Sequence, residues 1–512
     1  MPPQDTSKTS AFPTPPTMEE VPAPSGGVYS PAKSAPGASL PGNPSSTMPP
    51  APVLETNRNT PPTPTGQETT STVVPPPPKK AFPKKILFII LGLVIVVVLI
   101  FVIKSLLGKT TKTQITEVTW WGLWEDETII APLIEEYQTA NPNIKITYVK
   151  NSPQDYRERL TNALAKGTGP DIFRFHNTWV PMFSSELDNV PASVIGGGEY
   201  AQTFYPVITS DLTSGTGLVG VPLGYDALTL FINEDIFAQA GVEPPTTWVE
   251  MRERALQLTK KENNMIIQAG VALGRTENVD HWPEILGLMM IQNGVSLTNP
   301  TGQLAENALT FFTLFAKTDG VWDETLPPST TAFAGGKLAM YFGPSWRAFN
   351  IREQNPDLKF KTVPLPQLPK EDPNEPDVSY ATYWAEGVWA RSKNKTAAWN
   401  FLKFLISKDN LGKLYQTASA SRGFGEAYPR VDMKDLLLDH AVLGSIIKLA
   451  PYAESWYLAS RTFDGETGIN TQINKYFEDA INGINEGKQA DKVMEPVTSG
   501  VRQVLSQYGL VK

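Results

Sequence analysis

Aromatic side chains stand next to hydrogen-bonding side chains at three places where predicted strands end. Flat aromatic rings pack against the apolar C–H faces of a pyranose, while carboxylates and amides hydrogen-bond to its hydroxyl rim. Ligands of open α/β sheets bind outside the carboxyl ends of the strands, so these groups predict a pocket for a sugar-like solute. The first candidates are Trp121, Trp124, Phe175, His176, Asn177, Tyr225 and Asp226.

Trp120 and Trp121 are neighbours in a predicted strand, so their side chains must point to opposite faces of the sheet. We assign Trp120 to the core and Trp121 to the pocket. His176 also fits an ordinary structural histidine. His281 fits the same description and is left out of the candidate set.

The elements that must position these residues alternate between strand and helix. β-branched stretches predict strands, and apolar residues at helical spacing predict helices. This alternation is typical of a parallel α/β sheet. The predicted order is strand 115–121, helix 127–140, strand 144–149, helix 156–164 and strand 170–175, followed by helices within 231–241, 248–258, 397–405 and 469–508. Because about 400 residues exceed the size of one hydrophobic core, we expect two lobes.

The N-terminal part of the chain has a different composition. Residues 1–83 hold 22 of the 46 prolines and no tryptophan, so they bury too little apolar surface to fold and are predicted to be disordered. Residues 86–103 are an unbroken apolar run flanked by lysines, which predicts a transmembrane helix over 84–107 and a linker over 108–114. Four lysines precede the run and three follow it. That bias favours a cytoplasmic N-terminus and an extracytoplasmic C-terminal domain.

Charge and composition exclude several classes of function. The chain has a net charge of −8, and residues 113–512 alone carry −13, which disfavours binding to nucleic acid. There are no cysteines and three widely spaced histidines, so we expect no metal site and no cofactor. Residues 215–220 spell G-x-G-x-x-G, but Pro222 and a β-rich stretch follow instead of a helix, so no dinucleotide site is expected.

Six segments in order carry a family resemblance. They are NPNIKITYV (141–149), GPDI (169–172), GVPLGYDALTLFINEDIF (220–237), AGVEPPTTW (240–248), FAGGKLAMYFGP (333–344) and KNKTAAWNFLKFL (393–405). Together they resemble the extracellular solute-binding proteins of the maltodextrin-binding type, which serve ABC importers, over essentially all of residues 115–510.

The resemblance implies an α/β, two-lobed periplasmic-binding-protein fold, type II-like, over residues 115–512. Lobe 1 is expected at about 115–225 and 380–425, and lobe 2 at about 226–379 and 426–512. It also implies a monomer that closes on a sugar or other small polar solute and delivers it to permease subunits. Such a protein is not an enzyme.

The resemblance also assigns site residues by position. Trp124 and Glu125 match a first ligand loop, Phe175 to Thr178 match a second, and Asp226 matches a carboxylate that binds sugar hydroxyls. Trp384 and Glu386 depart from the small residues usual at their position and suggest a specificity feature of this chain. The remaining candidates carried over are Trp282, Trp346, Trp456, Tyr457 and Arg461.

Two alternatives remain open. The same clamp would serve a sensory module that reports its ligand to a membrane partner. A glycoside-active enzyme would use two carboxylates, such as Asp226 and Glu386, held at a fixed separation.

Overall fold

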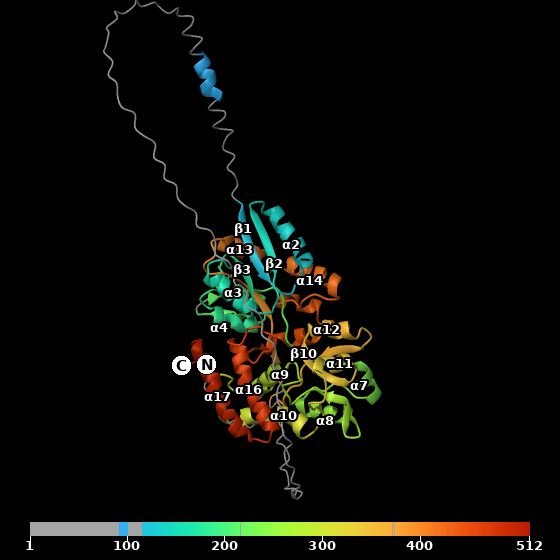
Figure 1. The fold of residues 1–512 in the computed structure, drawn as a ribbon. Coiled ribbons are helices and arrows are strands. Elements are labelled where there is room, and N and C mark those ends of the chain that lie inside the picture. The colour runs from blue at the N-terminus through green and yellow to red at the C-terminus, as the bar shows by residue number, and fades with distance from the viewer. Residues whose placement is uncertain (1–91, 101–114, 216, 371, 373, 512) are drawn as a thin grey trace, which may run out of the picture. The chain divides into compact units, whose positions relative to one another are not determined.

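The computed structural model describes residues 92–100, 115–215, 217–370, 372 and 374–511 (Figure 1). Residues 92–100 form a helix with exposed side chains and belong to a unit separate from the one that holds residues 115–511. Within the described residues, no helix is both long and apolar enough to cross a membrane. The rest of the predicted span, the predicted disordered tail and the linker lie outside the described residues.

The first sheet has five strands in the order β2-β1-β3-β13-β6. β1 runs parallel to β2 and β3, as the alternating sequence predicts, while β13 pairs antiparallel with β3 and with β6. The strands are β1 (Thr116–Gly122), β2 (Ile144–Lys150), β3 (Ile172–His176), β6 (Val221–Pro222) and β13 (Trp384–Val388). β13 enters this sheet from more than 160 residues further along the chain than β6, so the lobe is built from two separate stretches of sequence.

Helices cover the first sheet, and we call the two together the first lobe. Of these helices, α2, α13 and α14 contact one another, and α2 buries Ile130, Leu133, Ile134 and Tyr137 on one face, as predicted. The helices are α2 (Glu127–Ala140), α3 (Tyr156–Ala165), α4 (Val180–Phe183), α5 (Gly197–Thr203), α6 (Pro206–Asp211), α13 (Lys395–Leu405) and α14 (Lys408–Arg422). A short hairpin of β4 (Thr213–Ser214) and β5 (Gly217–Leu218) occupies the glycine-rich stretch where no dinucleotide site was expected.

The second sheet also has five strands, in the order β11-β7-β10-β9-β8. They are β7 (Leu228–Asn233), β8 (Lys260–Glu262), β9 (Met265–Val271), β10 (Leu338–Pro344) and β11 (Phe360–Val363). The central strands β7 and β10 are buried along their whole length, so both faces of this sheet are covered.

The second sheet and its helices form the second lobe. Local sequence explains several helix ends: Thr247 and Glu250 form a capping box at the start of α8, and Gly241 adopts a left-handed conformation at the end of α7. The helices are α7 (Glu234–Ala240), α8 (Trp248–Leu258), α9 (Trp282–Gln292), α10 (Gln303–Lys317), α11 (Ser329–Ala334), α12 (Arg347–Gln354), α15 (Gly444–Leu449), α16 (Ile469–Asn485) and α17 (Ala490–Gln507).

Three stretches of chain pass side by side between the two sheets. Isolated β-bridges join them: Tyr225 pairs with Ala427, and Ala227 pairs with Ala381. β12 (Ser379–Tyr380) and β14 (Ala453–Glu454) pair next to them. Short, adjacent crossings of this kind are where two lobes can rotate relative to each other. The mixed α/β, two-lobed architecture predicted from the sequence is confirmed.

Candidate ligand-binding site

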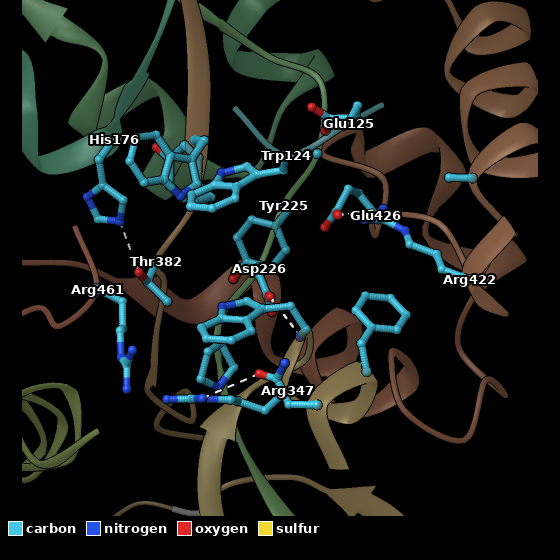
Figure 2. Close-up of a pocket in the computed structure, with 18 of the residues that line it drawn as sticks. Trp124, Glu125, His176, Tyr225, Asp226, Arg347, Thr382, Arg422, Glu426 and Arg461 are labelled. Atoms are coloured by element: carbon cyan, nitrogen blue, oxygen red, sulfur yellow. Dashed lines mark hydrogen bonds and ion pairs between the residues drawn. The ribbon is translucent and has the colours of Figure 1, made fainter. Parts of the chain in front are cut away.

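A cavity of about 780 Å³ is lined by residues of both lobes and of the crossing stretches. Figure 2 shows Trp124, Glu125 and His176 on one side, Arg347 and Arg461 on the other, and Tyr225 and Asp226 between them. A volume of this size suits a small or medium-sized organic ligand.

A buried ion-pair cluster forms the first-lobe wall. Arg174 of β3 lies between the carboxylates of Glu125 and Glu386. Its Nη2 is 2.6 Å from Glu386 Oε1, and its Nη1 forms an ion pair with Glu125 Oε2. Trp120 donates its indole N–H to Glu386 at 2.9 Å. Burial raises the pKa of Glu386, although the guanidinium of Arg174 acts in the opposite direction. The cluster therefore fixes Glu125 at the cavity wall.

Aromatic rings form the next part of the wall. Trp124 and Trp384 meet edge to face, with ring centroids 5.5 Å apart, and Trp384 contacts the ring of His176 in the same way at 5.1 Å. Phe463 lies 5.9 Å from Trp124. Rings held in this way by one another present rigid apolar surfaces to a ligand.

His176 is a neutral polar group within this aromatic wall. Its Nδ1 accepts from the backbone N–H of Thr178, so Nε2 carries the proton and donates to the Thr382 hydroxyl at 3.1 Å. Burial lowers the pKa of His176 to about 3. The ring is thus uncharged at neutral pH and joins the first lobe to a crossing stretch.

Asp226 lies in the first crossing stretch and lines the cavity. One carboxylate oxygen accepts the backbone N–H groups of Ala227 at 2.8 Å and Ser345 at 3.0 Å. Burial, reinforced by the nearby carboxylate of Glu426, raises the pKa of Asp226 to about 7, although the backbone N–H groups counteract this.

A hydrogen-bond relay forms the second-lobe wall. Arg347 donates Nε–H to His281 Nε2 at 2.8 Å, which leaves the His281 proton on Nδ1, 3.0 Å from the Ser460 hydroxyl. Ser460 in turn donates its hydroxyl and its backbone N–H to Glu284, at 2.9 and 2.6 Å. Burial lowers the pKa of His281. The relay holds a cation and a carboxylate at opposite ends of a neutral imidazole.

Three further charged residues line the cavity. Arg422 forms an ion pair with Glu426 at 2.6 Å and lies 5.0 Å above the ring of Phe349. Asp280 accepts hydrogen bonds from Thr330, which hold its pKa below the ordinary value although burial alone would raise it.

Eight of the predicted site residues line the cavity. They are Trp124, Glu125, His176, Tyr225, Asp226, Trp346, Trp384 and Arg461. Among them, Arg461 adopts a left-handed backbone conformation with φ of 58°, in a loop next to the cavity. Trp346 lies beneath the guanidinium of Arg347, at 4.4 Å from ring centroid to Cζ.

Two predicted site residues of the first lobe lie in buried positions outside the lining. Phe175 is fully buried because its β3 position points into the core, and Asn177 is buried while donating to Asp211 at 2.9 Å. Trp121 also lies outside the lining, half-buried on the face of β1 opposite Trp120. Here Trp120 is fully buried, as expected.

Four other predicted site residues also lie outside the lining. Glu386 is only 1% exposed because it sits behind Glu125 as the partner of Arg174. Trp282 begins α9 and lines a neighbouring pocket with residues 459–466. Trp456 and Tyr457 are half-buried and pack against each other, with centroids 5.6 Å apart, beyond the cavity wall.

Sequence reasoning missed most of the charged lining. His281, predicted to be structural, directly precedes the predicted site residue Trp282 in the HWPE segment, and Glu284 follows two residues after it in the first turn of α9. Arg347 directly follows Trp346, so its proximity to a chosen residue was the available signal. Arg174, Arg422 and Glu426 carried no signal of their own in the sequence. Within the described residues, no group of acidic or histidine side chains is arranged to hold a metal ion.

The fold and the cleft define a two-lobed ligand-binding protein. Residues 123–411 match the family of bacterial extracellular solute-binding proteins, and the chain belongs to that family. A binding protein of Brucella abortus (strain 2308) is 23% identical over 340 residues, which are 63% of this chain and 79% of that protein. The maltotriose-binding protein of Pyrococcus abyssi is 21% identical over 313 residues, 58% of this chain and 63% of that one.

The same fold appears among solved structures. The ABC transporter solute-binding protein of Thermotoga lettingae, solved with α-D-tagatose bound, matches with a TM-score of 0.59 and 22% identity, over 76% of this chain and all of that one. A solute-binding role for residues 115–511 follows from the family, the fold and the cleft together.

Proposed function

We propose that this chain is a membrane-anchored, extracytoplasmic protein that captures a carbohydrate-like ligand by hinge closure and delivers it to an ABC importer. The observation that carries the proposal is the cavity itself. It lies at the crossing stretches and takes aromatic and hydrogen-bonding groups from both lobes. Ligand contacts from both lobes are what make the closed state more favourable than the open one.

The wall chemistry supports a polyhydroxylated ligand. Trp124, Trp384 and Trp346 offer ring surfaces, and carboxylates and guanidinium groups stand between them. The Pyrococcus abyssi relative is named for maltotriose, and the Thermotoga lettingae protein was solved with tagatose bound. Both ligands are sugars, which agrees with this chemistry. We propose lobes at about 115–225 with 380–425, and 226–379 with 426–512.

The proposed anchor rests on the apolar run 86–103 and its flanking lysines. Its described portion, residues 92–100, is helical with exposed apolar side chains. An exposed apolar helix is stable next to lipid and costly in water. We therefore keep the proposal of a single span with the N-terminus in the cytoplasm.

A glycoside-active enzyme would need both Asp226 and Glu386 at the cavity, and only Asp226 lines it. Glu386 is buried against Arg174 and Trp120, outside the cavity lining, so it has no access to a glycosidic oxygen. A sensory role uses the same cleft and differs only in the partner. Deletion of the gene for this protein should abolish uptake of its ligand if the protein serves import, and should leave uptake unchanged if it serves only sensing.

Ligand titration of residues 113–512 tests the binding proposal. A glycan panel that includes maltotriose should raise the melting temperature, since binding stabilises only the folded state. Small-angle scattering should show a smaller radius of gyration with ligand bound. A domain that folds but gives neither response to any glycan of the panel, neutral or charged, would refute the proposal.

A further inference from the structure

The charged groups of the cavity are unevenly paired. Four arginines line it, and each lies within ion-pair distance of a carboxylate that also lines it. Arg174 contacts Glu125, Arg422 contacts Glu426, and Arg347 and Arg461 share Asp280 at 3.7 and 3.4 Å. No lysine is among the described lining residues. Each arginine of the described lining therefore already lies within ion-pair distance of a carboxylate.

Two lining carboxylates lack such a partner. Asp226 is 6% exposed and accepts hydrogen bonds from backbone N–H groups and from the side chain of Ser345, and no lysine or arginine in the described part of the chain pairs with it. Glu284 is 1% exposed, and its Oε2 has no hydrogen-bond partner among the described residues. Glu386 adds a second carboxylate to the single cation of Arg174. Negative charge thus exceeds positive charge around the cavity.

The unpaired carboxylate of Asp226 lies near a second carboxylate, that of Glu426, which pairs with Arg422. Residues 224–225 lie against 426–427, which brings Glu426 next to Asp226, and Figure 2 shows both carboxylates beside the same space. Tyr225 and Trp346 line the cavity at this point. Aromatic rings next to paired carboxylates are a favourable environment for an ammonium group.

We propose that the cavity selects glycans carrying a protonated amine, which binds between Asp226 and Glu426, and excludes anionic glycans. This inference rests on the proposed sugar-binding function and names its substrate class. An ammonium group at Asp226 gains a buried, charge-assisted hydrogen bond, which is stronger than one from a hydroxyl. A carboxylate or phosphate there would meet the unpaired carboxylate of Asp226 in a medium of low polarity, while the nearby Arg422 is already bound to Glu426.

The opposite end of the cavity is suited to neutral hydroxyls. Arg347 is 6% exposed and its Nη2 has no hydrogen-bond partner among the described residues, while Glu284 offers an unused acceptor on the other side of His281. A hydroxyl both donates and accepts, so the hydroxyls of one sugar ring can satisfy both groups. Asp280 is held by hydrogen bonds from Thr330 and Ser329 and already supplies a carboxylate to Arg347 and Arg461.

Calorimetric titration of the full chain in detergent micelles at neutral pH tests the proposal. The probes are matched pairs: glucosamine against N-acetylglucosamine, and chitobiose against N,N′-diacetylchitobiose. Maltotriose serves as a neutral reference, and digalacturonate and sn-glycerol 3-phosphate as anions. We expect the amine of each pair to bind at least tenfold more tightly than its acetylated partner, and the anions to bind at least tenfold more weakly than maltotriose.

Substitution of Asp226 locates the amine. Asp226→Asn should remove most of the tenfold preference for each amine over its acetylated partner. Asp439→Asn, at an exposed aspartate with no ion pair among the described residues, is the matched control and should keep the preference. If neutral glycans bind but amines gain nothing, or anions bind more tightly, the inference fails while the proposed function stands. If no glycan of any class binds, both fail.

Discussion

Replacement of Arg174 with methionine should be among the most destabilising single changes in the first lobe. The Arg174 side chain is 4% exposed, and its two partners, Glu125 and Glu386, are 7% and 1% exposed. Removal of the guanidinium leaves two buried carboxylates without a counter-charge. Breaking a buried ion pair from one side costs about 3–5 kcal/mol, a large share of a typical unfolding free energy.

Urea unfolding followed by tryptophan fluorescence measures this loss, because Trp120 donates to Glu386 within the same cluster. Glu386→Gln in the Arg174→Met background removes one of the stranded charges and should recover at least part of the stability. Arg391→Met is the matched surface control: Arg391 is 55% exposed and pairs with Glu186, so its loss should cost about 1 kcal/mol or less. A loss below about 1 kcal/mol for Arg174→Met would refute the charge argument.

Further predictions address binding, pH and topology. Trp124→Ala should weaken the binding of a recognised glycan about tenfold, or about 1.4 kcal/mol, whereas Trp456→Ala, outside the cavity lining, should change it less than threefold in the same titration. The pKa of His176 falls from 6.5 to about 3 on folding, so stability present above pH 6.5 is lost at about 1.4 kcal/mol per pH unit as the pH falls toward 3. Urea unfolding at pH 7, 6 and 5 measures the unfolding free energy. This free energy should fall less between pH 7 and pH 5 for His176→Gln than for the wild type. Protease added to intact cells should spare an N-terminal tag and digest the C-terminal domain; loss of the tag would reverse the proposed orientation.

Many helices and strands could be predicted from the sequence because the patterns that indicate them lie within a few neighbouring residues. Ile130, Leu133, Ile134 and Tyr137 recur at helical spacing. The helix predicted over 127–140 is confirmed with the same first and last residues. The helix predicted over 248–258 is confirmed with the same bounds, since its capping box lies within four residues. The helix expected within 231–241 begins only at Glu234, because the first residues complete the buried strand β7.

The residues that line the cavity could be predicted only in part, because the direction of a side chain depends on contacts with residues far away in the sequence. Glu386 seemed a specificity residue, yet its strand register places it opposite Arg174, 212 residues earlier in the chain. Trp456 was predicted to form a wall against the ligand, but it packs against Tyr457 and is not among the residues that line the cavity. His281 and Arg347 come together from positions 66 residues apart, and neither position shows that contact in the sequence.

The hydrogen bonds of Asp226 determine which part of the protein it would follow during opening. Its carboxylate accepts from Ser345 and Trp346, immediately before α12 of the second lobe, and its carbonyl accepts from Thr382. A rotation that preserves these bonds must bend the chain before Asp226, around Gly224 and Tyr225. The second lobe would then keep its hold on the ligand while Trp124 and Glu125 withdraw. Release would therefore be sequential, with the ligand leaving the first lobe before it leaves the second.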